Sequence, residues 1–411
     1  MTTGGEAAEA LGALGREEAA RSAAFLREAL PGPLRPAFGE AFIRSHILYG
    51  EFVCRLVLGI ARECGMATAL GAPGDAGEIV ARAGLEAPQA RVPVDWMLRF
   101  LAARGWVAEI PRGANRRYRS RGELPLLDAS PVRQEQQRWD PSWMPAYVLA
   151  ETVARDYPAF LRGDVAGEDV LFAPRRLRLW VDYFSNDNGL YAVNNRVGAV
   201  AVADWLPGPG SSILELGGGL ASGALALLAE LEARDRLRDV RGYRFTEPVS
   251  AFLRRGEQTL RDRYPTLAGL SFGALDMNQG FGEQGVGPAS VSVVYAVNTL
   301  HAARDLGFTL EEVYRALSPG GRLVISECVP PPEPIYADFV FNLTEAFRSP
   351  RLDPPHRPRG GFLGLEDWTA VVDAAGFEDV RVLPDVAAIR VEVPDWSVAA
   401  IGGLRPDGKR R

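Results

Sequence analysis

The spacing of hydrophobic residues changes near residue 205 of this 411-residue chain. Before that point apolar positions recur at helical spacing, and the stretch 92–105 is the clearest case, because its apolar side chains share one helix face. Beyond it, short apolar runs that favour strands alternate with helical patterns, which is typical of α/β folds built on a parallel sheet. We therefore expect a mostly helical N-terminal part followed by an α/β domain.

Four consecutive segments are expected from this pattern. Residues 1–38, rich in Ala, Glu and Gly, should form a flexible or weakly helical tail. Residues 39–125 should form a winged helix, with three helices and a hairpin whose tip is PRGAN, and Asp75 should cap the start of one helix. Residues 126–204 are predicted to be a helical linker, and 205–411 the α/β domain.

Seven strands are predicted in the last segment. Each run combines apolar, strand-favouring residues with a boundary of turn residues. A single helix is expected at 335–347. The resulting sheet should be Rossmann-like, with a final strand that runs antiparallel. The strands are predicted within 213–216, 240–248, 270–281, 291–306, 316–334, 361–385 and 396–404.

The stretch ILELGGGLASGA at 213–224 is expected to be the centre of a ligand site. An apolar strand passes an acidic residue, turns through three glycines and runs directly into a helix. Glycine permits backbone angles closed to other residues and lets a ligand approach the main chain, while the N–H groups of the helix start offer donors. A small ligand should therefore dock over this turn.

The spacing of these glycines does not fit a dinucleotide fingerprint. That fingerprint needs Gly at the first, third and sixth places. Counted from Gly217 the sixth place is Ser222, and counted from Gly218 the third place is Leu220. Neither register fits, so the ligand is expected to lack a pyrophosphate group.

The turn instead resembles the first motif of class I S-adenosylmethionine (SAM) methyltransferases. An acid stands two places before a Gly-x-Gly-x-Ala turn, formed here by Glu215, Gly217, Gly219 and Ala221. In that family the glycines lie against the methionyl part of SAM. The resemblance implies SAM as the cofactor and these four residues as part of its site.

Polar residues at the ends of successive parallel strands meet at one edge of a sheet, where α/β folds bind ligands. Glu247 ends the second predicted strand, and a carboxylate there can accept hydrogen bonds from both ribose hydroxyls. Asp276 ends the third strand and suits the adenine amino group, with Met277 packing on the ring. Asn298 ends the fourth strand and is expected near the cofactor as well.

The run YFSNDNGLYAVNN (183–195) combines aromatic and amide side chains just upstream of the glycine turn. Methyltransferases of this type often close the SAM pocket with such a segment, so the resemblance places Tyr191 and Asn195 near the cofactor. The N-terminal winged helix is similar to that of many bacterial and plant small-molecule methyltransferases. In those enzymes it is a dimerisation and substrate-lid module, and 126–204 is expected to complete the lid.

A histidine and a glutamate supply the candidate chemistry. His301 follows the fourth strand and Glu327 ends the next one, so the carboxylate can orient the imidazole across adjacent strand ends. NTLHAARDL and LVISE, spaced 327 − 301 = 26, resemble the His–Glu dyad of polyketide-synthase C-methyltransferase domains. YRFTEPVSAFLRRG resembles the second-strand region of the same domains. The resemblance implies His301 as the base and Glu327 as its orienter.

The amino-acid composition excludes several classes of binding partner. With 46 basic and 52 acidic residues the net charge is −6, which argues against a general affinity for nucleic acid. Three scattered cysteines are too few for a disulfide framework or a metal site. No apolar run reaches the roughly 18 residues of a membrane span, and no signal peptide is recognised. We expect a cytoplasmic homodimer that uses no metal.

These observations predict a SAM-dependent methyltransferase of secondary metabolism. Carbon methylation next to a carbonyl is favoured slightly. Oxygen methylation of a phenol or enol stays open, because the winged N-terminal domain, SECVPP and the histidine also resemble small-molecule O-methyltransferases. Carrier-protein and ketosynthase motifs are not found, so a polyketide acceptor would arrive free or on a separate carrier protein. Two other classes stay open: a SAM-binding winged-helix regulator, and a non-methylating enzyme of the same fold.

Overall fold

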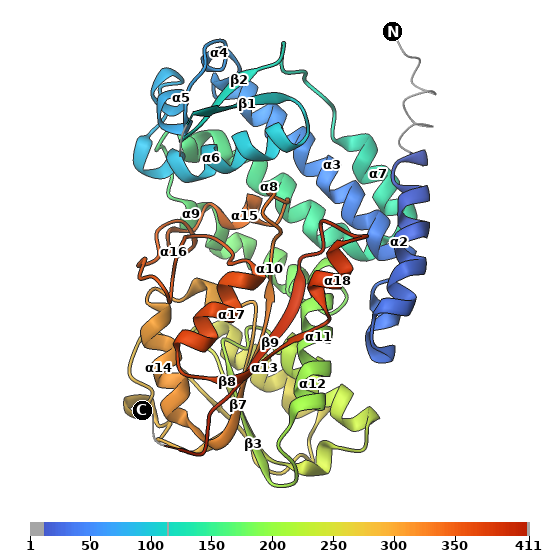
Figure 1. The fold of residues 1–411 in the computed structure, drawn as a ribbon, viewed down its shortest axis with the longest axis vertical. Coiled ribbons are helices and arrows are strands. Elements are labelled where there is room, and N and C mark those ends of the chain that lie inside the picture. Colours follow the sequence, from blue (N-terminus) through green and yellow to red (C-terminus); the bar gives the residue numbers. More distant parts are fainter. Residues whose placement is uncertain (1–11, 113–114, 409–411) are drawn as a thin grey trace. The chain divides into compact units, whose positions relative to one another are not determined.

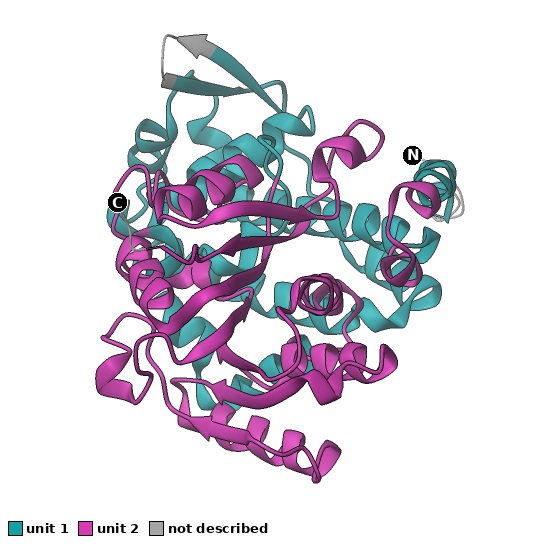
Figure 2. Ribbon diagram, turned by 60° about the horizontal axis from the view of Figure 1, so that its bottom comes forward, with its two compact units in different colours: residues 1–25, 39–183, 331–348 teal, residues 26–38, 184–330, 349–411 magenta. Residues whose placement is uncertain are grey.

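The computed structural model describes residues 12–112 and 115–408 (Figure 1). These residues form two compact units, which are coloured separately in Figure 2 and are described here one at a time. The chain passes repeatedly from one unit to the other, whereas the four predicted segments follow one another, and that division into four stays a prediction. Unit 1 comprises residues up to 25, 39–183 and 331–348, and unit 2 comprises 26–38, 184–330 and 349 onward.

Unit 1 consists of helices and one antiparallel hairpin, β1 (Val107–Arg112) with β2 (Asn115–Ser120). The tip residues 113–114 lie outside the described residues. The helices are α2 (Arg16–Ala29, which continues into unit 2), α3 (Glu40–Glu63), α4 (Met66–Ala69), α5 (Ala76–Arg82), α6 (Ala87–Ala103), α7 (Ser130–Trp139), η2 (Pro141–Trp143), α8 (Met144–Leu161), α9 (Gly167–Phe172), η3 (Pro174–Arg176), α10 (Leu177–Tyr183), α15 (Asp338–Phe341) and α16 (Glu345–Arg348).

The start of α5 confirms the predicted cap. Asp75 Oδ1 accepts a hydrogen bond from the Glu78 N–H at 2.9 Å, and Glu78 Oε2 accepts one from the Asp75 N–H at 3.1 Å. Two N–H groups that the helix itself cannot pair are thereby satisfied. The helices before the hairpin occur in the order expected for a winged helix, and that assignment itself stays a prediction.

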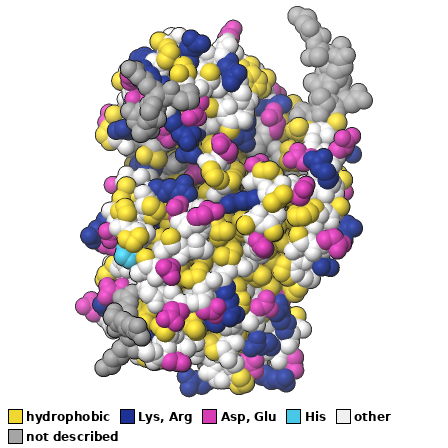
Figure 3. Space-filling view, viewed as in Figure 1, with side chains coloured by type: hydrophobic (Ala, Val, Ile, Leu, Met, Phe, Trp, Pro, Cys, Tyr) yellow, Lys and Arg dark blue, Asp and Glu magenta, His cyan; other side chains and the backbone are white. Residues whose placement is uncertain are grey.

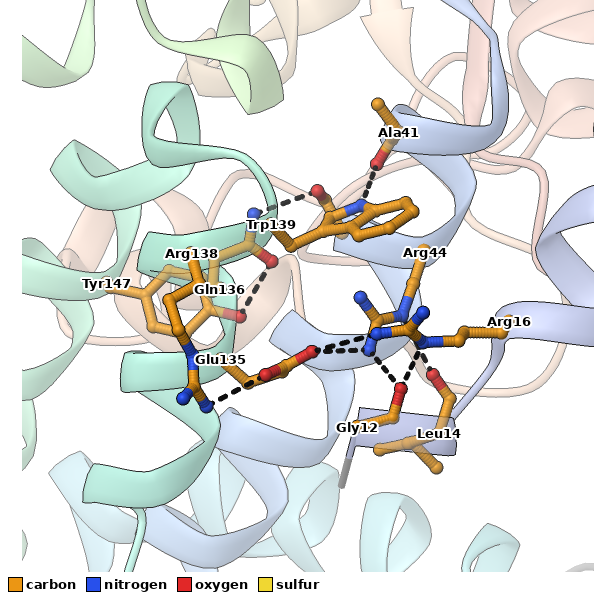
Figure 4. A network of polar contacts seen from close by, with 11 residues as sticks. Gly12, Leu14, Arg16, Ala41, Arg44, Glu135, Gln136, Arg138, Trp139 and Tyr147 are labelled. Carbon is orange, nitrogen blue, oxygen red and sulfur yellow. Dashed lines mark hydrogen bonds and ion pairs between the residues drawn. The ribbon is translucent and has the colours of Figure 1, made fainter. Parts of the chain in front are cut away.

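A buried polar network joins α3 to α7 (Figure 4). Arg44 is fully buried, and its Nη2 donates to Glu135 Oε1 at 2.7 Å. Arg138 Nη2 donates to the other oxygen, Glu135 Oε2, at 2.9 Å. The Arg44 guanidinium also lies 4.3 Å from the ring centroid of Trp139. Because a lone buried charge is strongly destabilising, this pairing fixes how the two helices meet.

The segment 331–348 is held within unit 1 by contacts with distant parts of the sequence. Trp96 Nε1 donates to the Ile335 carbonyl at 3.3 Å, and the Tyr157 hydroxyl donates to the Phe339 carbonyl at 3.1 Å. The single helix predicted at 335–347 is wrong, because the chain forms two short helices here, α15 and α16. Thr344 Oγ1 bonds the Phe341 carbonyl at 3.0 Å between them, a local contact that competes with helix continuation.

Unit 2 is built on the predicted seven-stranded sheet, in the order β5-β4-β3-β6-β7-β9-β8. The strands β3 to β7 are parallel, and β9 runs antiparallel to both β7 and β8, which confirms the expected final strand. The strands are β3 (Ser211–Leu216), β4 (Val240–Thr246), β5 (Leu270–Gly273), β6 (Val291–Val297), β7 (Leu317–Cys328), β8 (Glu378–Leu383) and β9 (Val398–Leu404).

Helices cover both faces of this sheet (Figure 2). The central strands β3 and β6 are buried along most of their length, because neither face meets water. The helical elements are η1 (Gly32–Ala37), α11 (Gly189–Trp205), α12 (Ser222–Ala233), η4 (Leu237–Asp239), α13 (Ser250–Arg263), η5 (Gly282–Gln284), η6 (Leu300–Ala302), α14 (Leu306–Ala316), α17 (Leu365–Ala374) and α18 (Val386–Arg390).

Charged side chains of both signs are interspersed on the face shown in Figure 3, rather than separated into regions of one sign. Among the helices that the structure describes, none has the length and hydrophobicity needed to cross a bilayer.

Candidate functional site

The glycine turn between β3 and α12 takes the form that the sequence predicts. Gly217 and Gly219 have φ angles of 59° and 55°, in the left-handed region that favours glycine. A Cβ atom on Gly217 would lie 2.5 Å from Thr299 Cγ2, whereas one on Gly219 would meet nothing within 4 Å. Gly217 therefore allows close packing inside the protein, and Gly219 leaves an open side of the main chain. Ala221, with φ of 70°, is the last residue before α12.

Glu247 lies directly after β4 and contacts this turn. Its Oε2 accepts a hydrogen bond from the Gly219 N–H at 3.0 Å, and its Oε1 accepts one from the Val249 N–H at 2.9 Å. The residue is only 6% exposed. Burial raises the pKa of Glu247, while the two N–H donors act in the opposite direction. The acid expected to hold a ribose is thus positioned beside the open side of Gly219.

The Glu215 side chain, on β3, is buried. Its Oε2 accepts a hydrogen bond from the Tyr243 hydroxyl at 2.9 Å. Burial raises the pKa of Glu215 to about 8; the nearby Glu247 acts in the same direction, and hydrogen bonds from Tyr243 and the Ala224 N–H oppose it. These contacts join β3, β4 and the first turn of α12, so the side chain holds the glycine turn in place.

Asp276 and Met277 follow β5 and are partly exposed. Asp276 Oδ1 accepts from the Asn278 N–H, and Oδ2 accepts from Gln279 Nε2, both at 2.9 Å. Burial alone would raise the pKa of Asp276, but these hydrogen bonds outweigh it and lower the pKa. The carbonyl of Met277 accepts from Thr309 Oγ1 at 3.0 Å. Hydrogen bonds within the loop and one from α14 therefore hold this loop in place. The predicted contact with adenine stays a prediction.

Amide side chains connect the start of α11 with the glycine turn. Asn195 Nδ2 donates to Asn186 Oδ1 at 2.8 Å, and Asn186 Nδ2 donates to the Ser222 carbonyl at 2.9 Å. The ring of Tyr191 lies edge-on to Phe184, with centroids 5.2 Å apart. The segment that contains the predicted Tyr191 and Asn195 is thus anchored at the first residue of α12.

Asn298 lies between the ends of β6 and β7, with a positive φ of 47°. Its Oδ1 accepts hydrogen bonds from Asn194 Nδ2 at 2.5 Å and from the Cys328 N–H at 3.2 Å. Sequence reasoning selected Asn195 and missed Asn194, its neighbour on the helix. The pair of adjacent asparagines could have indicated Asn194. Neighbouring residues on a helix point about 100° apart, so only one of the two can face the ends of the strands.

His301 and Glu327 meet across adjacent strand ends, as predicted. His301 Nδ1 lies 2.7 Å from Glu327 Oε2. The other oxygen, Glu327 Oε1, accepts from the N–H groups of Thr299, Leu300 and His301 at 3.0, 2.9 and 3.3 Å. Glu327 is fully buried and the His301 side chain is 8% exposed. The buried carboxylate is thus held in place by three main-chain donors.

Two residues near this pair were not predicted. Thr299 Oγ1 donates to the Gly217 carbonyl at 3.3 Å, which links the glycine turn to the His301 turn. Arg357 is fully buried and its Nη2 donates to the His301 carbonyl at 3.1 Å. It comes from a loop rich in Pro, Arg and Gly, where no periodic pattern indicates which arginine is buried. The site therefore includes a contact from a loop residue that lies 56 residues further along the sequence.

The curated relatives of this chain are much longer proteins. No protein-family model matches the chain. It is similar to highly reducing polyketide synthase 2 of Gibberella zeae, with 28% identity over 243 residues that cover 57% of this chain and 9% of that protein. Reducing polyketide synthase Preu2 of Preussia isomera is 31% identical over 179 residues, 44% of this chain and 7% of that protein. The chain thus spans less than a tenth of the length of these relatives.

Three solved structures share the fold over nearly the whole chain. The CurJ carbon methyltransferase has a TM-score of 0.73 at 20% identity, over 94% of this chain and 99% of that one. The DszA carbon methyltransferase has a TM-score of 0.68 at 22% identity, over 97% and 96%. The CMeT domain of the citrinin polyketide synthase has a TM-score of 0.67 at 16% identity, over 92% and 99%. The predicted resemblance is confirmed for the fold: the chain has the class I SAM methyltransferase fold that these three structures share.

Proposed function

We propose that this chain is a SAM-dependent methyltransferase that methylates a carbon next to a carbonyl group in a small-molecule or polyketide-like acceptor. The observation that carries the proposal is the contact of 2.7 Å between His301 Nδ1 and the buried Glu327. A buried carboxylate behind an imidazole is the arrangement needed to take a proton from a weakly acidic carbon. The fold of the carbon methyltransferases supports the same assignment.

The residues around the glycine turn fit SAM. The open side of Gly219 lets a ligand approach the main chain closely, and the Glu247 carboxylate lies next to it. When bound, SAM supplies a methyl group on a positively charged sulfur. The motif of Gly217, Gly219 and Ala221 would face its methionyl part, and Glu247 would hold its ribose. The remaining contacts are assigned to Asp276 and Met277 at the adenine, and to Tyr191, Asn195 and Asn298 around the cofactor, with Glu215 positioning the turn.

His301 acts as the base in this proposal. In the tautomer that this role requires, the imidazole carries its proton on Nδ1 and donates a hydrogen bond to Glu327 Oε2, so Nε2 holds the lone pair. Nε2 takes the proton from the acceptor carbon, and the electrons of that C–H bond pass into the neighbouring carbonyl. This carbon would then take the methyl group that SAM supplies, with S-adenosylhomocysteine as the leaving group. Glu327 stabilises the resulting imidazolium until His301 releases the proton to water.

The dyad is tested by substitution. Purified protein is assayed with SAM and a small β-keto acyl thioester, and S-adenosylhomocysteine is quantified. We expect His301→Ala to keep its calorimetric affinity for S-adenosylhomocysteine and to lose activity by about 10²- to 10⁴-fold. His356→Ala is the matched control, because that histidine is 31% exposed and has no assigned role. Full activity in His301→Ala would overturn the proposed role.

Other functions give different results. Oxygen methylation would use the same dyad, so only the position of the new methyl group separates it from carbon methylation. A SAM-binding regulator would show salt-sensitive, sequence-specific DNA binding in a gel shift and no turnover. A non-methylating enzyme would convert its substrate without producing S-adenosylhomocysteine. The homodimer, the cytoplasmic location and delivery of the acceptor by a separate carrier protein remain predictions.

A further inference from the structure

The loop 349–364 packs against the turn that carries His301. The Arg351 N–H donates to the Arg304 carbonyl at 2.9 Å, and the Arg351 side chain pairs with Asp305 at 2.5 Å. The ring of Phe362 lies against the His301 imidazole, with centroids 4.7 Å apart. All of these residues belong to unit 2. The loop therefore packs on the His301 ring through Phe362, and Arg351 ties it to the residues that follow His301.

Arg357 is the buried charge of this loop. It is fully buried, and Nη2 donates to two carbonyls, those of His301 at 3.1 Å and Gly361 at 2.9 Å. Its Nε and Nη1 are buried and find no hydrogen-bond partner among residues 12–112 and 115–408. Burying a guanidinium with donors unpaired is costly. An arginine serving only to fill space would be less favourable than an apolar residue, so the charge itself calls for a role.

The positive charge of Arg357 lies close enough to Glu327 to be attracted by it. Burial lowers the pKa of Arg357, and the largest opposing influence is the attraction of Glu327. The same guanidinium donates to the His301 carbonyl at 3.1 Å, so a buried positive charge lies directly beside the turn that carries the imidazole. Other charged groups on these segments are Arg304, Arg351 paired with Asp305, His356 at 3.8 Å from Asp353, and Arg359 paired with Asp367 at 2.8 Å.

We propose that Arg357 is a positioning residue for His301: its guanidinium fixes the main chain of the His301 turn, and its buried positive charge opposes the gain of a second positive charge on the neighbouring imidazole. This inference rests on the proposed role of His301 as the base. Arg357 would then be a third member of the His301–Glu327 site. It acts through the His301 carbonyl and through its own positive charge, and it takes no part in the proton transfer itself.

The test measures the titration of the His301 ring by NMR, which needs no substrate. Protein with ¹³C-labelled histidine is titrated, and the His301 signal is assigned by its loss in His301→Ala. Arg357→Met removes the positive charge that disfavours the imidazolium form, so we expect the midpoint of the His301 titration to rise by about one pH unit. Arg359→Met removes a charge from the same loop, but its side chain is 44% exposed and we expect no shift. An identical midpoint in wild type and Arg357→Met would overturn the proposal.

Activity provides the second readout. The acidic limb of the pH profile of kcat should move in the same direction as the NMR midpoint in Arg357→Met. Arg357→Lys keeps a cation but loses the two-carbonyl contact, and it should shift the midpoint less while lowering kcat about tenfold. If Arg357→Met does not fold, Arg357→Lys decides, because unchanged kcat and midpoint there would contradict the proposal. Failure of the methyl-transfer assay in the wild type would overturn the proposed function instead, and would leave the NMR result interpretable.

Discussion

Glu247 accepts a hydrogen bond from the main-chain N–H of Gly219 at 3.0 Å, which ties the acid after β4 to the turn after β3. If this carboxylate also holds the ribose of SAM, Glu247→Ala should weaken S-adenosylhomocysteine binding by about 10- to 100-fold, since hydrogen bonds to charged groups contribute about 1.5–3 kcal/mol each. Isothermal calorimetry measures this loss. Glu257→Ala, which breaks an exposed ion pair with Arg261, should bind as the wild type does. Equal affinities for all three proteins would contradict the assignment.

The two outer glycines of the turn should respond differently to an added methyl group. Both occupy left-handed conformations, so alanine costs about 1–2 kcal/mol at either position. Gly217→Ala must also displace Thr299, which lies 2.5 Å from the new Cβ, and overpacking adds about 1–3 kcal/mol. Gly219→Ala meets no protein atom, so it should fold better than Gly217→Ala and yet lose cofactor affinity. Urea unfolding and calorimetry separate the two effects, and the reverse order of stability would show the turn to be misassigned.

Burial of Glu215 should make stability depend on pH. Its pKa rises from 4.5 to about 8 in the folded protein, so the folded state holds more protons than the unfolded state between these values. The stability it contributes is therefore complete below pH 4.5 and is lost as the pH rises to about 8. Urea unfolding of the wild type and Glu215→Gln at pH 5 and pH 8.5 should show a larger decline in the wild type. Equal declines would mean that Glu215 does not titrate as its burial implies.

Much of the site could be predicted because its signals are local in the sequence. Gly217 and Gly219 mark a turn that needs positive φ, and the polar residues Glu247, Asn298 and Glu327 each stand at or just beyond the end of a predicted strand. Parallel strands bring such positions to one edge of a sheet whatever the loops between them do. The contact between His301 and Glu327 follows from that topology, because β6 and β7 are neighbours.

The remaining features depend on packing between distant segments. Arg357 lies in a loop whose composition predicts solvent exposure, and only the folded chain brings it to the His301 carbonyl. Tyr243 could be placed on a strand, but its hydrogen bond to Glu215 depends on the register of β3 and β4. The segment 335–347 has helical periodicity, and Thr344 interrupts it through a local bond that periodicity does not reveal.

The position of the transferred methyl group tests the central claim most directly. The protein is incubated with SAM labelled with ¹³C in the methyl group and a small β-keto acyl thioester, and the product is analysed by NMR. The account predicts a carbon-bound methyl group at the position between the two carbonyls, formed in equal amount with S-adenosylhomocysteine and absent with His301→Ala. A methoxy signal, or a carbon-bound methyl formed equally well without His301, would contradict it.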